Sequence, residues 1–263
     1  MSSHEIQDEL WGRAPRDWAD LQENLAAPLW QSMLAACGVS TGTLLLDAGC
    51  GAGGASVLAR THGAVVTGLD ASDGLLDVAR QRVPEGDFRV GDLENLPFAD
   101  ATFDTIIAAS SIQFAHDPLR AVRELVRVAK PDSRISVGLF STPDKVEYRA
   151  VLEAIAAALS DPDASMRPFA LSHSGVLEDL LETAGLAVML SEDVACPFVF
   201  QDMDTYLRGV ISAGPVQAAL DVLGEPCLRR ILEEAAAPYQ LPDGRIRFEV
   251  AFHHVTGAPS PTR

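Results

Sequence analysis

Short apolar runs alternate with helical stretches between Thr43 and Phe140, and this alternation constrains the fold more than any other feature of the sequence. The apolar runs include TLLLD, AVVTGLD and FDTIIAAS, and stretches with helical spacing such as SDGLLDVARQRV lie between them. Strands that alternate with helices pair in parallel, because each helix returns the chain to the start of the next strand. The sequence therefore predicts an α/β fold with a doubly wound, Rossmann-like, mostly parallel sheet over residues 43–140.

The segments that flank this core have a different pattern. Residues 5–36 are typical of amphipathic helices, and we expect them to form an N-terminal helical lid. Residues 143–239 combine helices with one strand-like run and are predicted to be a variable, mainly helical insertion beside the core. Residues 245–255 alternate in character after a Pro-Asp-Gly turn, which predicts a last, antiparallel strand. We expect a single domain over residues 1–263, since no internal repeat divides the chain.

Charge and cysteine content limit the possible partners. The formal net charge is −17, and the only lysines are Lys130 and Lys145, so we expect no nucleic-acid partner. No apolar stretch approaches the roughly 18 residues of a membrane span, and the N-terminus lacks the pattern of a secretory signal. The four cysteines are far apart, which predicts reduced thiols, no metal site and a cytoplasmic location.

A glycine-rich turn follows the first apolar run. Residues 44–54 read LLLDAGCGAGG, in which Gly49, Gly51 and Gly54 fit the dinucleotide-binding pattern G-x-G-x-x-G. Asp70 ends the next predicted strand, at the distance where a carboxylate binds the ribose hydroxyls of a nucleoside. A dinucleotide and an adenosyl ligand fit these residues equally well.

Asp47, which directly precedes the glycines, separates these two ligands. A pyrophosphate on this turn would lie close to a carboxylate, and repulsion in a partly dry cleft costs on the order of several kcal/mol. A ligand without phosphate that carries a cationic amino group would be favoured there. S-adenosylmethionine (SAM) has this chemistry, because it joins an adenosine to a sulfonium and a protonated amine.

The core resembles the class I SAM-dependent methyltransferases, in particular their small-molecule group called type 11 or UbiE-like. Four segments carry the resemblance in consecutive order: LLLDAGCGAGG, VTGLDAS, VGDLENLPFADATFD and SSIQFAHDPLRAVRELVRVAKPD. The resemblance implies a Rossmann-like fold, SAM as the cofactor and a small-molecule methyl acceptor. The N-terminal WGRAPRDWADLQE is also similar to the lid helix of one bacterial subgroup.

The resemblance implies a cofactor contact at each matching position of the first two segments. Gly49 and Gly51 would face the methionine and ribose parts of SAM. Asp47 would lie near the amine, and Asp70 would accept hydrogen bonds from both ribose hydroxyls. Ala71 would pack against the adenine.

The later segments supply the remaining contacts that the resemblance implies. Asp92 would accept a hydrogen bond from the adenine amino group, and the backbone N–H of Leu93 would reach a ring nitrogen. Ser110 would offer its carbonyl to the methionine amine. Gln113 is also placed beside the cofactor, although the family commonly has His or Glu at that position. Trp18 would close over the cofactor or pack in the core.

The sequence is less informative about the reaction itself. SAM carries a transferable methyl group, so the protein mainly holds the acceptor in line and excludes water, and a base is needed only for some acceptors. The candidate bases are His116, His173 and His254, each of which has a structural role as its alternative. Aromatic residues in 143–239 favour an apolar acceptor, with oxygen, nitrogen and carbon all open as the methylated atom.

Two other functions remain as alternatives. A descendant of the family that binds SAM without transferring its methyl group, for example a cyclase, would keep the same cofactor motifs. A nicotinamide-dependent oxidoreductase would share the glycines and Asp70, but Asp47 and Asp92 argue against it.

Overall fold

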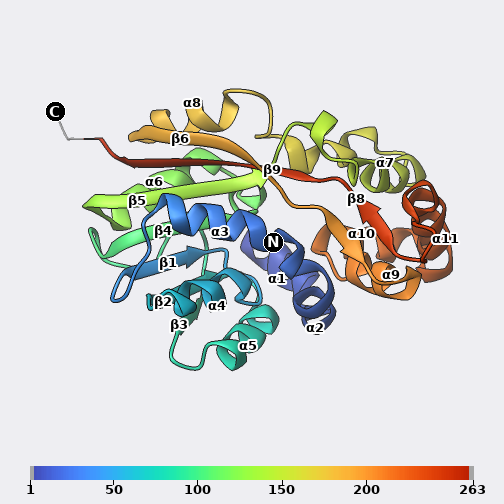
Figure 1. Cartoon of the computed structure of the whole chain (residues 1–263), viewed down its shortest axis with the longest axis horizontal. Helices are drawn as coiled ribbons and strands as arrows, with labels where there is room; N and C mark the ends of the chain where they lie inside the picture. The colour runs from blue at the N-terminus through green and yellow to red at the C-terminus, as the bar shows by residue number, and fades with distance from the viewer. Residues whose placement is uncertain (1–2, 261–263) are drawn as a thin grey trace.

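The computed structural model describes residues 3–260, and its largest element is a seven-stranded sheet (Figure 1). The strands of this sheet are β1 (Leu44–Ala48), β2 (Val65–Asp70), β3 (Asp87–Val90), β4 (Phe103–Ala109), β5 (Ala129–Phe140), β6 (Leu186–Ala195) and β9 (Ala251–Pro259). Their order is β3-β2-β1-β4-β5-β9-β6. The first five strands pair in parallel, and β9 runs antiparallel to both β5 and β6. The predicted α/β class and the mostly parallel sheet are confirmed.

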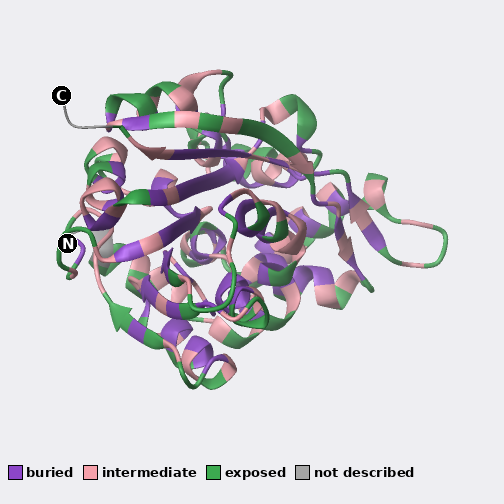
Figure 2. Cartoon of the chain, turned by 60° about the vertical axis from the view of Figure 1, so that its left-hand side comes forward, coloured by how far each residue is buried: buried purple, intermediate pink, exposed green. Residues whose placement is uncertain are grey.

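Helices cover both faces of the sheet, so its central strands are largely buried, whereas the edge strands β3 and β6 are mostly not (Figure 2). One face is covered by α3 (Ala27–Ala36), α4 (Gly54–Thr61) and α5 (Asp73–Arg82). The other face is covered by α6 (Pro118–Val128) and α8 (Val176–Thr183). Apolar side chains between the sheet and each helical layer form two separate core clusters. This arrangement is the doubly wound architecture that the alternating sequence predicts.

Helix α6 shows how local sequence sets the ends of these elements. The side chain of Asp117 accepts a hydrogen bond from the backbone N–H of Arg120 at 3.0 Å, and Pro118 occupies the first turn. The helix ends at Val128, and β5 begins at the next residue, because the position before Pro131 disfavours helical backbone.

A smaller region lies beside the sheet, at the right in Figure 1. It contains a two-stranded sheet of β7 (Phe198–Phe200) and β8 (Ile246–Phe248), with four helices: α7 (Arg149–Ala158), α9 (Met203–Ile211), α10 (Gly214–Leu223) and α11 (Glu225–Ala236). Short 3₁₀ turns lie in the connections of this region: η4 (Pro143–Lys145), η5 (Pro162–Ser165), η6 (Arg167–Phe169) and η7 (Ala237–Tyr239). A further one, η3 (Ile112–Phe114), lies between β4 and α6. Its apolar side chains belong to the same core cluster as those of α3 and α4. The two regions therefore share one continuous core.

The prediction of a single strand over 245–255 is wrong. The chain forms β8 in the small sheet, leaves it, and then forms β9 in the large sheet. Ile246, Phe248, Val250 and Phe252 are all at most 3% exposed, so every second side chain is buried from β8 across the break into the start of β9. An unbroken alternation cannot reveal that the partner strand changes.

The N-terminal segment is helical, as expected, but it is divided into short pieces. These are α1 (Ser3–Trp11), α2 (Pro15–Asp17), the π-helical turn η1 (Trp18–Gln22) and the 3₁₀ turn η2 (Glu23–Ala26), which leads into α3. Within residues 3–260, none of the helices combines the length and apolar character that crossing a bilayer requires.

Candidate functional site

A cavity of about 240 Å³ lies where the carboxyl ends of β1, β2 and β4 meet. On the same measure one water molecule needs only about 10–15 Å³, so a cavity of about 240 Å³ can hold a ligand much larger than water. The strand order reverses direction between β1 and β4, and ligands of doubly wound sheets bind at such a switch point. The N-terminal segment and the smaller region complete the wall.

The structure brings all ten predicted cofactor-contact residues together on the wall of this cavity. They are Trp18, Asp47, Gly49, Gly51, Asp70, Ala71, Asp92, Leu93, Ser110 and Gln113. The convergence has a simple cause, because the carboxyl ends of neighbouring parallel strands meet at one edge of the sheet.

Glycines in the turn after β1 permit close packing. Gly49 has a positive φ of 78°, and its N–H donates to the Leu69 carbonyl at 2.7 Å. A Cβ at Gly49 would lie only 2.2 Å from the Cβ of Ser111. A Cβ at Gly54 would lie 2.4 Å from the indole ring of Trp30. The turn thus needs glycine both for its own conformation and for the approach of α3.

Asp70 is held in a fixed orientation at the end of β2. Its Oδ2 accepts from the Gly51 N–H at 2.8 Å, and its Oδ1 accepts from the Ser72 N–H at 2.9 Å. These bonds connect the glycine turn to the carboxylate predicted to bind ribose. A carboxylate oxygen accepts more than one hydrogen bond, so both atoms can also receive ligand hydroxyls.

Asp47 is 2% exposed and lies at the base of the cavity. Its Oδ2 accepts a hydrogen bond from the Ser56 hydroxyl at 2.6 Å. Burial raises the pKa of Asp47 to about 7, the Ser56 hydrogen bond acts in the opposite direction, and the charge of Asp70 raises it further. A cation placed beside this carboxylate would offset the cost of burying its charge.

Glu23 is a second buried carboxylate on the wall, and the sequence analysis did not identify it. It comes from η2 in the N-terminal segment and accepts from the Ala52 N–H and from Arg82, both at 2.7 Å. Burial raises the pKa of Glu23 to about 7, although the Arg82 charge lowers it. A lone glutamate in a helical segment gives no signal of this contact.

Arg82 links the N-terminal segment to the glycine turn. Besides Glu23, its guanidinium donates to the carbonyls of Ala19 at 2.7 Å and Ala52 at 3.2 Å, and it contacts Asp20 at 3.4 Å. One side chain at the end of α5 thus holds the segment over the cavity.

The turns after β3 and β4 supply the rest of the predicted adenine and methionine contacts. Asp92 accepts from the Glu94 N–H at 2.9 Å, so its side chain stabilises a turn as well as lining the cavity. Ser110 has a positive φ of 53°, an uncommon conformation for a residue with a side chain. Such strain is concentrated at functional sites. The buried Oε1 of Gln113 has no hydrogen-bond partner among the described residues.

Aromatic rings cover the cavity from the N-terminal side. Trp11 and Trp18 meet edge to face with ring centroids 4.7 Å apart, and Trp11 contacts Phe114 at 5.7 Å. All three line the cavity, as does Trp30. The Trp18 ring therefore packs against its neighbours and also lines the cavity, while its contact with a cofactor stays a prediction.

The other part of the wall is apolar and comes from the end of β5 and from the smaller region. Its residues are Phe140, Tyr148, Leu152, Pro168, Phe198, Val216 and Phe252. Phe140 stacks on Phe252 at 4.8 Å, in register between β5 and β9. We call this part the apolar end.

The charges on the wall are of one sign. Glu23, Asp47, Asp70 and Asp92 line the cavity, and within residues 3–260 no Lys, Arg or His does so. Arg82 compensates the charge of Glu23 at 2.7 Å, and the three aspartates favour cationic and neutral ligands over anions.

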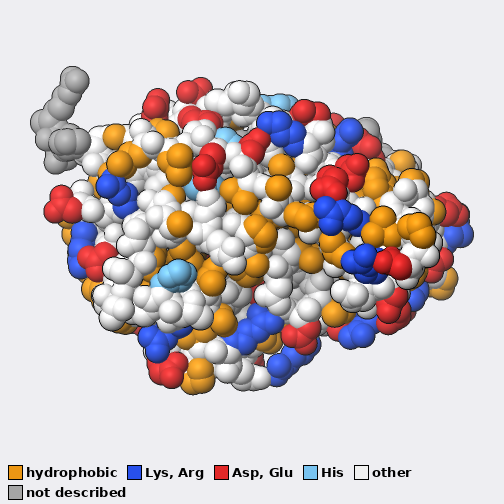
Figure 3. Space-filling model, viewed as in Figure 1, with side chains coloured by type: hydrophobic (Ala, Val, Ile, Leu, Met, Phe, Trp, Pro, Cys, Tyr) orange, Lys and Arg blue, Asp and Glu red, His pale blue; other side chains and the backbone are white. Residues whose placement is uncertain are grey.

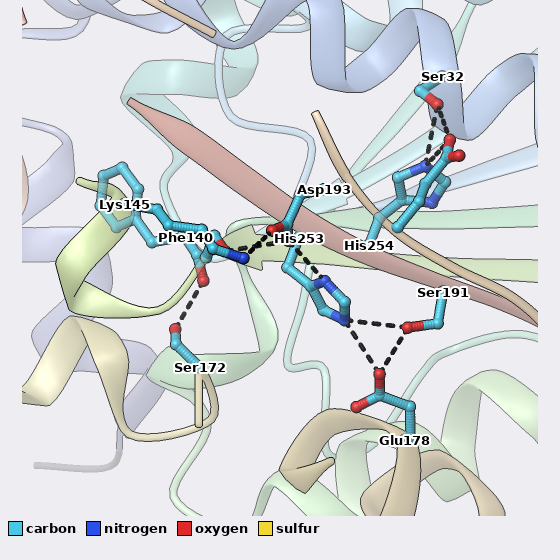
Figure 4. Close-up of polar contacts among 11 residues, drawn as sticks. Ser32, Phe140, Lys145, Ser172, Glu178, Ser191, Asp193, His253 and His254 are labelled. Atoms are coloured by element: carbon cyan, nitrogen blue, oxygen red, sulfur yellow. Dashed lines mark hydrogen bonds and ion pairs between the residues drawn. The ribbon is translucent and has the colours of Figure 1, made fainter. Parts of the chain in front are cut away.

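The histidines considered as bases lie elsewhere. His116, His173 and His254 are not part of the wall that residues 3–260 form. Figure 4 shows His253 and His254 pointing to opposite faces of the sheet, as adjacent residues of a strand must. His254 is fully buried, contacts Ser32 at 2.9 Å, and has its pKa lowered by burial.

His253 contacts side chains of neighbouring elements on the opposite face. Its Nδ1 lies 2.8 Å from Asp193, and its Nε2 lies 3.1 Å from Glu178 (Figure 4). Among the described residues, no group of three or more His, Cys, Asp or Glu side chains is arranged to hold a metal ion.

Comparison with known proteins finds similarity in the central part of the chain. The family model described as "Methyltransferase domain" matches residues 46–137. Malonyl-[acyl-carrier protein] O-methyltransferase of Serratia marcescens is 44% identical over 101 residues, 38% of each chain. Methyltransferase GfsG of Streptomyces halstedii is 34% identical over 165 residues, covering 60% of this chain and 57% of that protein. The matches thus span less than two thirds of these relatives.

Solved structures of low sequence identity share this fold. The [4+2]-cyclase SpnF superposes with a TM-score of 0.62 at 18% identity, covering 99% of this chain and 97% of that one. A likeness at this identity concerns the fold alone.

Proposed function

We propose that this chain, which carries a class I SAM-dependent methyltransferase domain over residues 46–137, transfers the methyl group of SAM to a small, apolar acceptor. One observation carries the proposal. The residues that the family resemblance assigns to the cofactor line a single cavity, and an apolar wall suited to an acceptor continues from them.

The cofactor would occupy the part of the cavity near the strand ends. Asp70 would receive the ribose hydroxyls while it remains bonded to the Gly51 N–H. Asp47 would lie near the methionine amine, where a cation compensates for its burial. Asp92 and Leu93 would contact the adenine, and the Ser110 carbonyl would contact the amine.

The protein contributes position and exclusion of water to the reaction. SAM supplies an electrophilic methyl group on a positively charged sulfur. Trp11 and Trp18 would cover the cofactor, and the apolar end would hold the acceptor in line with the sulfur–methyl bond.

The proposed partner is a small molecule and not a nucleic acid. On the face shown in Figure 3, basic side chains are interspersed with acidic ones and do not form one patch. The net charge of −17 also repels a phosphate backbone. All four cysteines are free, which fits the reducing cytoplasm where we place the protein.

Calorimetry tests the cofactor assignment directly. We expect SAM and S-adenosylhomocysteine (SAH) to bind the purified chain with micromolar affinity, and NADH to give no heat. Absence of binding by both sulfur nucleosides at high micromolar concentration would overturn the proposal.

Methyl transfer needs a second measurement. SAM with a labelled methyl group, added with a cell extract, should yield a labelled small molecule and a matching amount of SAH. The competing function, SAM-bound catalysis without methyl transfer, predicts no label transfer and undiminished turnover when SAH replaces SAM.

A further inference from the structure

SAM and SAH both end in an amino-acid group, and its carboxylate needs hydrogen-bond donors inside the cavity. An α-carboxyl group has a pKa of about 3.5, so this group is negatively charged at neutral pH. Removing such a charge from water without donors is strongly disfavoured. Within residues 3–260, no Lys, Arg or His side chain lines the cavity. We therefore expect neutral donors to bind this carboxylate.

The backbone of the glycine turn has no donor left for it. Every backbone N–H from residue 49 to residue 53 already donates within the protein, at 2.7–3.0 Å: Gly49 and Cys50 to the Leu69 carbonyl, Gly51 to Asp70, Ala52 to Glu23, and Gly53 to the Cys50 carbonyl. A turn that binds an anion through its backbone presents free N–H groups instead.

The start of α4, directly after this turn, is also covered. A Cβ at Gly54 would lie 2.4 Å from the ring of Trp30 and 3.0 Å from the carboxylate of Glu23. An anion placed at this helix start would therefore lie against a carboxylate. The donors for the cofactor carboxylate must come from another part of the wall.

Trp18 offers a neutral donor beside the glycine turn. Its Nε1 lies 3.6 Å from the point that a Cβ at Gly51 would occupy, and the family resemblance places the methionine and ribose parts of the cofactor at Gly51. This indole N–H makes no hydrogen bond within residues 3–260, whereas that of Trp11 donates to the Gln7 side chain at 2.9 Å. Trp30, the third tryptophan, turns the carbon edge of its ring to the turn. The Trp18 N–H is thus the indole donor that remains for a ligand.

The Trp18 indole is held in place before any ligand binds. Its ring meets Trp11 edge to face at 4.7 Å. The turn η1 that carries it is fixed by Arg82, which donates to the Ala19 carbonyl at 2.7 Å and also binds Glu23 at 2.7 Å. A donor that is already oriented loses little conformational freedom when it binds a ligand.

We propose that the indole N–H of Trp18 binds the carboxylate of the cofactor, so that the N-terminal segment selects SAM and SAH over nucleosides that lack this group. The inference rests on the proposed function, because it completes the binding of the same cofactor. The amine at the same end of the cofactor is left to Asp47 and the Ser110 carbonyl. The two opposite charges of the amino-acid group are then bound by two different parts of the chain.

The test compares SAH with its decarboxylated analogue, which keeps the adenosine, the sulfur and the amine. Titration calorimetry on the full chain gives the dissociation constant of each probe for the wild type and for Trp18→Phe, in which an aromatic ring remains but the N–H is lost. The ratio of the SAH constant to the analogue constant should rise at least about tenfold in Trp18→Phe, as expected for loss of a hydrogen bond to a charged group.

Trp11→Phe is the matched control. It makes the same change of ring in a neighbour whose N–H already has an acceptor, so the ratio of the two constants should stay that of the wild type. The inference is overturned if Trp18→Phe weakens both probes equally or leaves both unchanged.

A measurement on the wild type decides if Trp18→Phe does not fold. Of the indole N–H signals in its NMR spectrum, which come from three tryptophans, one should shift on addition of SAH and much less on addition of the analogue. Equal shifts with both probes would overturn the inference. Failure of SAH to bind the wild type would instead contradict the proposed function.

Discussion

Replacement of Asp47 by Asn should stabilise the empty protein above neutral pH and weaken its binding of the cofactor. Asn has nearly the same shape, and its oxygen can still accept the hydrogen bond that Ser56 now donates at 2.6 Å. The substitution therefore removes a buried charge while it preserves packing. The two expected effects have opposite signs because the same charge opposes folding and attracts a cationic ligand.

The magnitude follows from the pKa of Asp47, which burial raises from 3.8 to about 7. A difference of about three pKa units between the folded and unfolded states corresponds to about 4 kcal/mol of folding free energy. The folded-state pKa of Asp47 is higher than its unfolded-state pKa. The free energy of unfolding of the wild type is therefore highest below about pH 4, and it falls by about 4 kcal/mol as the pH rises through about 7. The Asn variant lacks this loss, so at about pH 8 it should exceed the wild type by up to about 4 kcal/mol.

Urea denaturation of the empty protein at several pH values between about 5 and 8 measures this difference. Asp132→Asn is a suitable control, because Asp132 is exposed and its substitution should leave the pH dependence unchanged. Calorimetry at about pH 8 should show SAH binding at least tenfold weaker to Asp47→Asn, since the cationic amine loses a charged neighbour. The reasoning is refuted if Asp47→Asn is no more stable than the wild type at that pH, or if its stability falls with pH as steeply as before.

Two further substitutions test the remaining polar contacts. Asp70→Ala should reduce SAH affinity by about 1.5–3 kcal/mol, the range for hydrogen bonds to a charged group, and an unchanged dissociation constant in calorimetry would contradict the ribose assignment. Arg82→Ala should destabilise the protein by roughly 2–3 kcal/mol above neutral pH, because it leaves the Glu23 carboxylate buried without its cation. Urea denaturation would measure this loss, and adding Glu23→Gln should restore part of it; no recovery in the double variant would show that the pair does not act through charge.

The sheet and the cofactor part of the site could be predicted because their signals are local. Each strand of the core is a short apolar run. Asp47 and Asp70 lie at the ends of β1 and β2 and Asp92 follows β3, and the carboxyl ends of these parallel strands must lie at one edge. Parallel pairing then brings residues far apart in sequence into one cavity. The order of the strands is enough to predict that these residues lie together, whereas their assignment to a cofactor rests on the family resemblance.

The contacts between the N-terminal segment and the glycine turn could not be predicted in this way. Glu23 and Arg82 are 59 positions apart, and neither belongs to a pattern that marks it as buried. Gly54 alone indicated that another element packs closely at the start of its helix, because glycine leaves room for such an approach. The sequence did not show that this element is Trp30.

The aromatic residues of 143–239 indicated an apolar acceptor region, but the sequence did not show which of them line the cavity. An aromatic residue beside a helix packs in the core more often than it faces a ligand, and the sequence does not distinguish the two cases.

The connection between β8 and β9 determines which parts of the molecule can move apart. Only Glu249 and Val250 separate the two strands, and both bond to other segments through their carbonyls, with Glu147 at 2.9 Å and Cys196 at 2.8 Å. The next carbonyl, that of Ala251, accepts from the Ser141 N–H at 3.0 Å. Because these three backbone hydrogen bonds hold the residues between β8 and β9, the connection cannot act as a hinge. The apolar end should therefore move together with the large sheet. Displacement of the N-terminal segment, by contrast, would require only that the contacts of Arg82 with Glu23 and the Ala19 carbonyl be broken, together with the packing of its helices.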